Sequence, residues 1–320
     1  MQNLIFGPII SRRFGYSLGI DLSPNTKQCN FDCLYCELQG AKPQDSMREV
    51  IPAYEYVDSI SRYLASNPKQ KIDVLTFTAN GEPTLYPHLL ELIKTLKPSL
   101  PPHIKTLILS NGSLFWQQSV REALLEFDMV KFSLDSLNPR TFARIDRPHK
   151  SLHLESIKKG IATFATEFTQ KTNGKLIGEI LLLKGVNDTS AHAKELAQFL
   201  SRIPISRLDI GTLDRPPAHK ATPLSIKEIE TFVSHFEGLC VYIPRRTSQD
   251  SNTPKRTLNK EELIQTLSMR PLTLEDMQAL FCDNTLALAD TLTKSHILKW
   301  EQVGNIAFLC PTNSTTKVLF

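Results

Sequence analysis

Three of the six cysteines in this 320-residue chain lie within eight residues, in the stretch KQCNFDCLYCEL. Cys29, Cys33 and Cys36 are separated by three and then by two residues, so one loop can bring all three sulfurs together. Structural zinc takes four protein ligands, and the nearest other candidates in the sequence are His88 and Cys240. An iron–sulfur cubane held by only three thiolates keeps one iron open to another ligand. We therefore predict a [4Fe-4S] cluster that binds something, with zinc and a remote fourth ligand as the alternative.

The remaining composition sets limits on compartment and partners. Six cysteines in a chain of this length do not form the dense disulfide set of a small secreted fold. We find no cleavable signal layout and no apolar run near the ~20 residues of a membrane span, so we expect a cytoplasmic protein with no membrane partner. We expect the widely spaced Cys240, Cys282 and Cys310 to be buried small residues rather than ligands of a second cluster. The net charge of +4 permits an anionic partner but does not identify one.

Six short apolar runs are each followed by a stretch with helical periodicity, which is typical of βα units around a mostly parallel sheet. The predicted strands are Ser17–Leu22, Asp73–Thr78, Ile104–Ser110, Met129–Leu134, Leu176–Leu183 and Arg207–Thr212. The predicted helices are Pro52–Ala65, Tyr86–Leu96, Trp116–Phe127, Ser151–Phe168, Ser190–Ser201 and Ser225–Phe236. We predict an α/β fold, an open or partial (β/α)6 barrel, because a closed barrel needs two more units.

Polar and small residues occur where five of these strands end, in the segments ANGEP, SNGS, SLDS, KGVND and LDRPP. Folds of this kind keep their active sites at the carboxyl ends of the strands. Any one segment could be an ordinary turn. Five of them on the same edge of the sheet indicate a functional face.

The last part of the chain predicts a second unit. We assign 1–244 to the barrel, 245–257 to a polar linker and 258–320 to the second unit. Its segments NKEELIQTLSM, TLEDMQALF and NTLALADTLTKS predict three short helices, and HILKWEQVGNIAFLC predicts two strands joined around Gly304. This is the order of a winged helix. The third helix carries two aspartates and a single lysine near its end, which disfavours DNA contacts, so we expect a docking or structural role.

The cysteine spacing, placed after the first strand of a βα array and with Tyr35 just before the last cysteine, resembles the signature of the radical S-adenosylmethionine superfamily. The resemblance implies that the methionine amino and carboxylate groups of S-adenosylmethionine chelate the open iron. It also implies that an electron from the reduced cluster cleaves the sulfonium, giving a 5′-deoxyadenosyl radical that abstracts a hydrogen atom from a substrate. A reductant such as a flavodoxin or a ferredoxin is then an expected partner.

The same resemblance assigns cofactor contacts to the segments after the second and third strands. Asn80, Gly81 and Glu82 of NGEP are similar to the family's GGE stretch, which holds the methionine ammonium; Asn80 stands in place of the first glycine. Ser110 and Asn111 end the third strand near the position of the family's contacts to the methionine carboxylate.

Further contacts follow from the resemblance for the fourth and fifth strands. Ser133 and Asp135 match the position that meets the ribose hydroxyls, where a carboxylate can accept two hydrogen bonds. Glu179 lies near the place of the adenine edge, and Tyr35 is expected close to the adenine. Ordinary alternatives stay open: a plain strand end for Ser133 and Asp135, a partner of a buried arginine for Glu179, and a tight turn for Asn111.

A narrower resemblance covers approximately residues 5–220. FGPIISRRFGYSLGIDLSP, TFTANGEPTL and TLDRPP are similar to segments of proteins related to the wyosine-base synthetases, which rebuild a tRNA base. Those enzymes carry a second cluster on cysteines upstream of the first motif, and the 28 residues before Cys29 contain no cysteine. Arg12 and Arg13 could bind a phosphate or carboxylate, or be solvated.

Three functions remain for this sequence. The first is a radical S-adenosylmethionine enzyme acting on a nucleic acid or nucleoside, most naturally a tRNA base. The second is an activase or maturase that directs the same chemistry at a protein or peptide, with the second unit docking the partner. The third is a non-enzymatic iron–sulfur or zinc regulator. We favour an enzyme, because a sensor does not need Glu82, Ser133 and Asp135 around an open iron.

Overall fold

The computed structural model describes residues 4–11, 13–244, 255–303 and 306–312, with the backbone alone at Met269. Two compact units make up the chain. One consists of Met1–Leu213 and Ala218–Pro244, and the other of Asp214–Pro217 and Arg245–Phe320. Arg12, Gly304 and most of the predicted linker lie outside the described residues.

The first unit is built on an eight-stranded sheet whose strands follow one another in chain order. The strands are β1 (Ile5–Ser11), β2 (Gly15–Asp21), β3 (Val74–Thr78), β4 (Lys105–Ser110), β5 (Met129–Ser133), β6 (Lys175–Leu182), β7 (Arg207–Thr212) and β8 (Val241–Tyr242). β1 pairs antiparallel with β2, and every later neighbour pairs in parallel. Because β1 and β8 are the two edges, the sheet is open, and the predicted partial barrel is confirmed.

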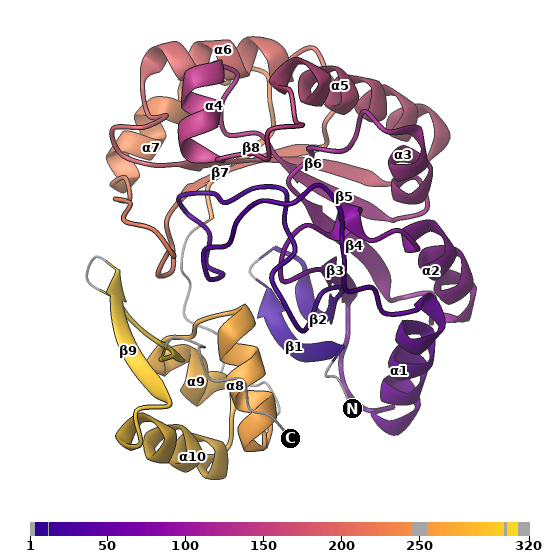
Figure 1. Cartoon of the computed structure of the whole chain (residues 1–320), viewed down its shortest axis with the longest axis vertical. Coiled ribbons are helices and arrows are strands. Elements are labelled where there is room, and N and C mark those ends of the chain that lie inside the picture. The colour runs from indigo at the N-terminus through magenta and orange to yellow at the C-terminus, as the bar shows by residue number, and fades with distance from the viewer. Residues whose placement is uncertain (1–3, 12, 245–254, 304–305, 313–320) are drawn as a thin grey trace. The chain divides into compact units, whose positions relative to one another are not determined.

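Helices flank the sheet along its outer face (Figure 1). They are α1 (Ala53–Ser66), α2 (Leu89–Leu96), α3 (Gln118–Leu124), α4 (Pro139–Ile145), α5 (Leu154–Lys171), α6 (Ser190–Leu200) and α7 (Ile226–Val233), with 3-10 turns η1 (Pro83–Leu85) and η2 (Lys97–Ser99). Side chains cap the N-termini of some of these helices by accepting backbone N–H groups. Ser225 forms a capping box with Glu228 at the start of α7, and Asn138 caps α4 by accepting two backbone N–H groups.

Alternation along the strands separates the core of the first unit from its inner face. Ile20, Phe77, Ile108 and Val130 share one row across β2 to β5, and all four side chains are fully buried. Phe77 packs edge-on against Phe127, which precedes β5, with ring centroids 5.2 Å apart. Alternate residues on these strands point to the opposite face. That inner face includes the polar residues Thr76, Lys131, Ser133, Glu179 and Asp209.

The second unit, taken by itself, has three helices followed by an antiparallel pair of strands, the predicted winged-helix order. They are α8 (Lys260–Met269), α9 (Leu274–Leu280), α10 (Asp283–Lys294), β9 (Leu298–Val303) and β10 (Ile306–Pro311). Leu263, Leu267, Leu292 and Phe308 are buried in its core. In the part of the chain that the structure describes, none of the helices is both long and apolar enough to cross a membrane.

Candidate functional site

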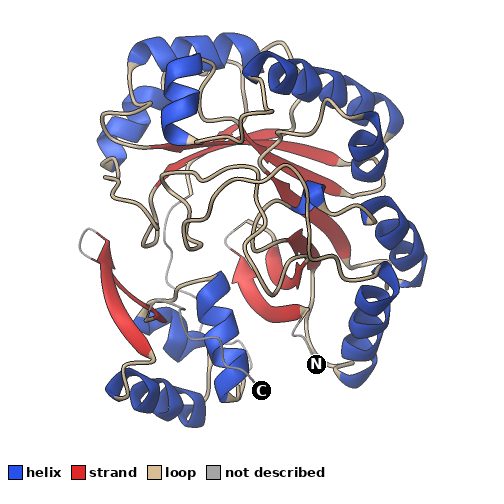
Figure 2. Cartoon of the chain, in the orientation of Figure 1, coloured by secondary structure: helices blue, strands red, loops and turns tan. Residues whose placement is uncertain are grey.

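The loop that carries the three cysteines joins β2 to α1 and runs along the inner side of the sheet (Figure 2). Its start is fixed by the backbone: the N–H of Gln28 donates to the carbonyl of Asn80 at 2.8 Å, and the N–H of Glu82 donates to the carbonyl of Gln28 at 3.0 Å. Gly81 lies between them with a φ of +143°, and a Cβ there would lie 1.8 Å from the carbonyl oxygen of Gln28. The segment after β3 therefore requires glycine, and it positions Cys29.

Asn80 also connects this segment to the end of β2. Its backbone N–H donates to Oδ1 of Asp21 at 2.8 Å, and the N–H of Ser23 donates to the same oxygen at 2.9 Å. Burial raises the pKa of Asp21 to about 6, although these two donors oppose the shift.

The middle of the cysteine loop is held against the end of α4. The N–H of Leu34 donates to the carbonyl of Ile145 at 2.8 Å, and that of Asp32 donates to the carbonyl of Asp146 at 3.1 Å. These backbone bonds flank Cys33 on both sides. The loop is thus fixed at two points that are far apart in the sequence.

Asp32 holds two further segments around the loop. Its carboxylate pairs with Nη2 of Arg147 at 3.0 Å and with Nε2 of His219 at 3.0 Å. The neighbouring Ala218 donates its N–H to the carbonyl of Cys36 at 2.7 Å. The Asp32 side chain is only 8% exposed, whereas its partners Arg147 and His219 are 42% and 25% exposed, so the buried carboxylate is paired with two groups at the surface. A side chain between two cysteines therefore ties their loop to the chain segments that follow α4 and β7.

The three thiols differ in their surroundings. Burial, and after it a neighbouring glutamate, raises the pKa of Cys29 to about 12. Cys33 lies 3.6 Å from Oδ1 of Asp146, and burial together with that carboxylate raises its pKa well above the usual value. The ammonium of Lys27 donates to Sγ of Cys36 at 3.3 Å. Because thiolates are the ligating form, cluster assembly at Cys29 and Cys33 must release protons.

The donor set fits an iron–sulfur cubane. All three cysteines are free and partly buried, on one loop. Among the described residues, no three His, Cys, Asp or Glu side chains are grouped as ligands of a single metal ion. Each cysteine of a cubane binds a separate iron, which does not require that grouping.

Glu82 connects the ends of β3 and β4 below the loop. Its Oε1 accepts from the N–H and hydroxyl of Thr84 at 3.0 and 2.6 Å and from the hydroxyl of Ser110 at 2.7 Å, and its Oε2 accepts from the N–H of Asn111 at 2.7 Å. The residue is 2% exposed, and burial raises its pKa against these four donors. Oε1 accepts three of these bonds and Oε2 accepts one, so Oε2 is the oxygen with room for a further donor. The predicted contact with a methionine ammonium stays a prediction.

The Asn111 side chain reaches the cysteine loop. Its Nδ2 donates to Oδ1 of Asn30 at 2.7 Å and lies 4.0 Å from Sγ of Cys29, while its Oδ1 accepts from the hydroxyl of Ser113 at 2.6 Å. The structure thus brings Asn80, Gly81, Glu82, Ser110 and Asn111 to one place beside the first cysteine.

Tyr35 and Asp135, predicted at the adenine and the ribose, lie in direct contact. The phenol of Tyr35 donates to Oδ2 of Asp135 at 2.5 Å, and the N–H of Leu181 donates to Oδ1 at 2.7 Å. Asp135 is 2% exposed, and burial raises its pKa to about 7. Ser133 lies on β5 directly opposite Glu179 on β6. The contacts of these residues with S-adenosylmethionine stay predictions.

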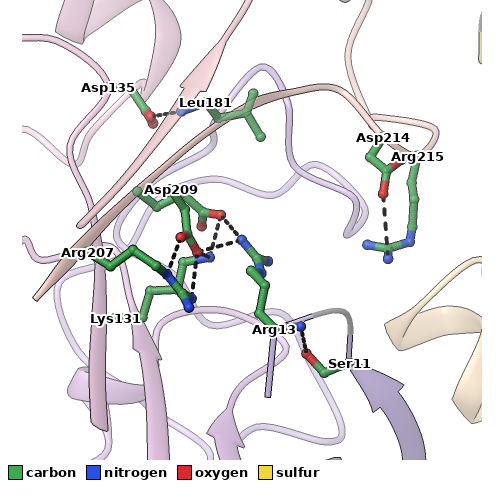
Figure 3. A network of polar contacts seen from close by, with 10 residues as sticks. Ser11, Arg13, Lys131, Asp135, Leu181, Arg207, Asp209, Asp214 and Arg215 are labelled. Carbon is green, nitrogen blue, oxygen red and sulfur yellow. Dashed lines mark hydrogen bonds and ion pairs between the residues drawn. The ribbon is translucent and has the colours of Figure 1, made fainter. Parts of the chain in front are cut away.

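Glu179 pairs with two cations of a charge network on the inner face, and Figure 3 labels Arg13, Lys131, Arg207 and Asp209 of this network. Its Oε1 accepts from Lys131 and, at 2.9 Å, from Nη1 of Arg13, which also pairs with Asp209 at 3.0 Å. Burial opposes ionisation of Glu179, but Lys131 and Arg13 outweigh it and lower its pKa to about 2. The structure therefore places Glu179 as the partner of an arginine, the ordinary alternative for this residue. Its contact with the adenine stays a prediction.

Sequence reasoning did not single out several of these residues. Lys131 and Asp209 each interrupt an apolar strand, in MVKFS and RLDIGT, and a charge at an inward position was the available signal. Asp32, Arg147 and His219 carry no comparable signal, because their pairing depends on loops that meet only in the folded chain.

The expectation of buried cysteines outside the motif is confirmed for Cys310 and wrong for Cys240. Cys240 is exposed because it lies in the turn between α7 and β8, and Cys282 is partly buried at the N-terminal cap of α10.

Comparison with known proteins places residues 24–200 in the family described as the Radical SAM superfamily. A UPF0026 protein of Helicobacter pylori is 46% identical over 309 residues, covering 96% of this chain and 97% of that protein. A GTP 3′,8-cyclase of Haemophilus ducreyi is 31% identical over 142 residues, 42% of this chain and 37% of the cyclase. The crystal structure of a radical SAM methyltransferase from Sphaerobacter thermophilus shares the fold, with a TM-score of 0.55 and 16% identity over 71% of this chain and 65% of that one.

Proposed function

This chain belongs to the radical S-adenosylmethionine superfamily, and on that basis we propose that it abstracts a hydrogen atom from a base in a nucleic acid or nucleoside, most naturally a tRNA base. The superfamily uses a [4Fe-4S] cluster and S-adenosylmethionine. When bound, these groups supply the 5′-deoxyadenosyl radical, and the protein orients it and excludes competing reactions.

The residues of this chain have distinct parts in the proposal. Cys29, Cys33 and Cys36 hold the cluster. Glu82 offers the remaining acceptor position of Oε2 to the methionine ammonium. The backbone carbonyl groups of Asn80 and Gly81 precede it in the chain. Lys27 places a positive charge beside one cluster ligand. The observation that supports the proposal is the backbone pairing of Gln28 with the segment around Gly81, because it sets Cys29, the first of the three thiols, beside the segment predicted to bind S-adenosylmethionine.

Support for a base as the substrate comes from the similarity of this sequence to enzymes that act on bases or nucleotides. The segments FGPIISRRFGYSLGIDLSP and TFTANGEPTL resemble those of wyosine-base enzymes. One relative is named as a GTP 3′,8-cyclase, and GTP, like a tRNA nucleotide, carries a base. The net charge of +4 is compatible with an anionic nucleic acid.

A protein or peptide substrate is the second candidate, and one observation favours it. Leu274, Trp300 and Ile306 of the second unit are 50%, 43% and 37% exposed. A surface of this unit that binds a protein would include such side chains, because large apolar groups gather where proteins meet. A docked partner would then be delivered by the second unit.

The nucleosides of total tRNA distinguish the two candidates. We expect a deletion strain to lose or accumulate one modified nucleoside relative to its parent, measured by liquid chromatography and mass spectrometry. Restoring the wild-type gene should restore the profile, and restoring Cys33→Ala should not. An unchanged profile in the deletion strain contradicts the tRNA proposal and favours a protein substrate.

A further inference from the structure

Five charged side chains from segments far apart in the sequence meet on the inner face of the sheet, and Figure 3 labels four of them, Arg13, Lys131, Arg207 and Asp209. Arg13 comes from the turn between β1 and β2, Lys131 from β5, Glu179 from β6, and Arg207 and Asp209 from β7. Arg13 and Lys131 each pair with both carboxylates, and Nε of Arg207 pairs with Oδ1 of Asp209 at 2.7 Å. The turn at one edge of the sheet thereby reaches strands near the other edge.

Two side chains of the network are buried, and the other three are partly exposed to solvent. The side chains of Lys131 and Asp209 are 4% and 1% exposed, whereas those of Arg13, Glu179 and Arg207 are 24%, 29% and 26% exposed. Solvent, and therefore a ligand, can reach the side chains of Arg13, Glu179 and Arg207. The site also adjoins the predicted cofactor contacts, because Ser133 lies directly opposite Glu179 in the strand register.

The charges of the network do not cancel. It contains three cations and two carboxylates, and within the described residues no ion pair connects it to a sixth charged group. Arg13 and Arg207 are partly shielded from water, and a partly desolvated positive charge is stabilised by a counter-ion. The network therefore favours binding of one further negative charge.

Donors for such an anion are available. The hydrogen bonds of Arg13 to Glu179 and Asp209 use only Nη1, and those of Arg207 to Asp209 use Nε and Nη2. In the described part of the chain, Nε and Nη2 of Arg13 and Nη1 of Arg207 make no other hydrogen bond. The Arg207 guanidinium lies over the ring of Phe14, with Cζ 5.5 Å from the centroid, and over the ring of Tyr242, with Cζ 5.3 Å from the centroid. It is therefore oriented before any ligand binds.

We propose that Arg13 and Arg207, next to the buried charge of Lys131, form a binding site for an oxyanion of the substrate, a carboxylate or a phosphate, inside the barrel. The site itself follows from the network alone. Only the assignment of the anion to the substrate depends on the proposed radical chemistry. Glu179 sets the affinity of this site, because its negative charge competes with the ligand for the same cations.

Two substitutions should therefore act in opposite directions. Arg13→Gln removes a charge-assisted donor and should weaken anion binding roughly tenfold to a hundredfold. Glu179→Gln keeps the shape but removes the competing charge, so it should tighten binding roughly tenfold. If the network only held the barrel together, neither substitution would change anion affinity in a charge-dependent way.

The test is isothermal titration calorimetry of the anaerobically reconstituted protein with inorganic phosphate and, separately, with acetate. Arg62→Gln is the matched control, because Arg62 pairs with Asp58 on the surface of α1 and should leave anion binding unchanged. Arg207→Gln is the second variant if Arg13→Gln does not fold, as judged by circular dichroism. The anion that binds with the higher affinity, phosphate or acetate, indicates whether the natural group is a phosphate or a carboxylate.

The outcomes separate this inference from the proposed function. Binding that weakens in Arg13→Gln and strengthens in Glu179→Gln supports the site. Equal binding in all variants, no binding of either anion, or displacement of the anion by S-adenosylmethionine overturns it, since the last result assigns the anion position to the cofactor. Formation of 5′-deoxyadenosine by the wild-type protein is measured in parallel. Its absence would contradict the radical chemistry and leave the anion result standing.

Discussion

The substitution Gly81→Ala tests how the cysteine loop is positioned. The Cβ of alanine would lie 1.8 Å from the carbonyl oxygen of Gln28, on a backbone with a φ of +143°. Such a backbone costs a non-glycine residue about 1–3 kcal/mol. Relief of the clash must also break the two hydrogen bonds of Gln28 with Asn80 and Glu82, worth about 0.5–1.5 kcal/mol each. We expect a loss of roughly 2–6 kcal/mol, a large share of the stability of a typical protein.

Two assays follow this loss. Urea unfolding of the metal-free protein, monitored by circular dichroism, gives the free energy of unfolding. Iron analysis after anaerobic reconstitution gives the cluster content, which should fall because Cys29 directly follows the displaced residue.

Gly238→Ala is the matched control for the backbone strain. Gly238 has a φ of +79°, and a Cβ added there would meet nothing within 4 Å, so we expect about 1–2 kcal/mol and full iron content. If Gly81→Ala unfolds and binds iron like Gly238→Ala, the pairing of Gln28 with the segment after β3 does not position the cluster loop.

Three further predictions concern single side chains. Asp21→Asn should remove a pH dependence of stability, because the raised pKa of about 6 stabilises the native protein fully below about pH 4 and this stabilisation is lost as pH rises through 6. In urea unfolding, the free energy of unfolding of the variant should therefore rise by roughly 1–3 kcal/mol relative to that of wild type between pH 4 and pH 8. Parallel stability curves for the two proteins would contradict this. Tyr35→Phe leaves a buried oxygen of Asp135 without its phenol donor and should cost about 1–3 kcal/mol in the same assay; no loss would show that the bond does not stabilise the fold. Lys27→Met should make the midpoint potential of the cluster more negative, because a cation beside Cys36 favours the reduced cluster. The potential is measured by potentiometric titration followed by electron paramagnetic resonance, and Lys27→Arg should leave it unchanged. Equal potentials in Lys27→Met and wild type would exclude that role.

Six of the seven strands that pair in parallel could be predicted from the sequence because each is a short, mostly apolar run; the two-residue β8 was not predicted. The strand at 207–212 has the predicted bounds, and the other five differ by one or two residues at one or both ends. β1 was missed because Gly7 and Pro8 interrupt it and its pairing shifts register between Phe6 and Ile9, features that argue against a strand. α4 was also missed, since it has only seven residues and its cap, Asn138, also suits a turn.

The candidate site could be predicted only in part, for a related reason. Cys29, Cys33 and Cys36 lie close in sequence, so their spacing alone indicates shared chemistry. Glu179 shows the limit of the approach. Its inward position follows from strand alternation, but its cations lie 166 and 48 residues away, and no local pattern indicates that they meet.

The central claim is that three cysteines hold a cluster whose open iron takes S-adenosylmethionine. The most direct test is to reconstitute the protein without oxygen, reduce it in the presence of S-adenosylmethionine, and quantify 5′-deoxyadenosine against bound iron. We predict about four irons per chain and formation of 5′-deoxyadenosine, both lost in Cys33→Ala. A wild-type protein that binds one zinc ion and forms no 5′-deoxyadenosine, or a Cys33→Ala variant that forms as much as wild type, would contradict the account.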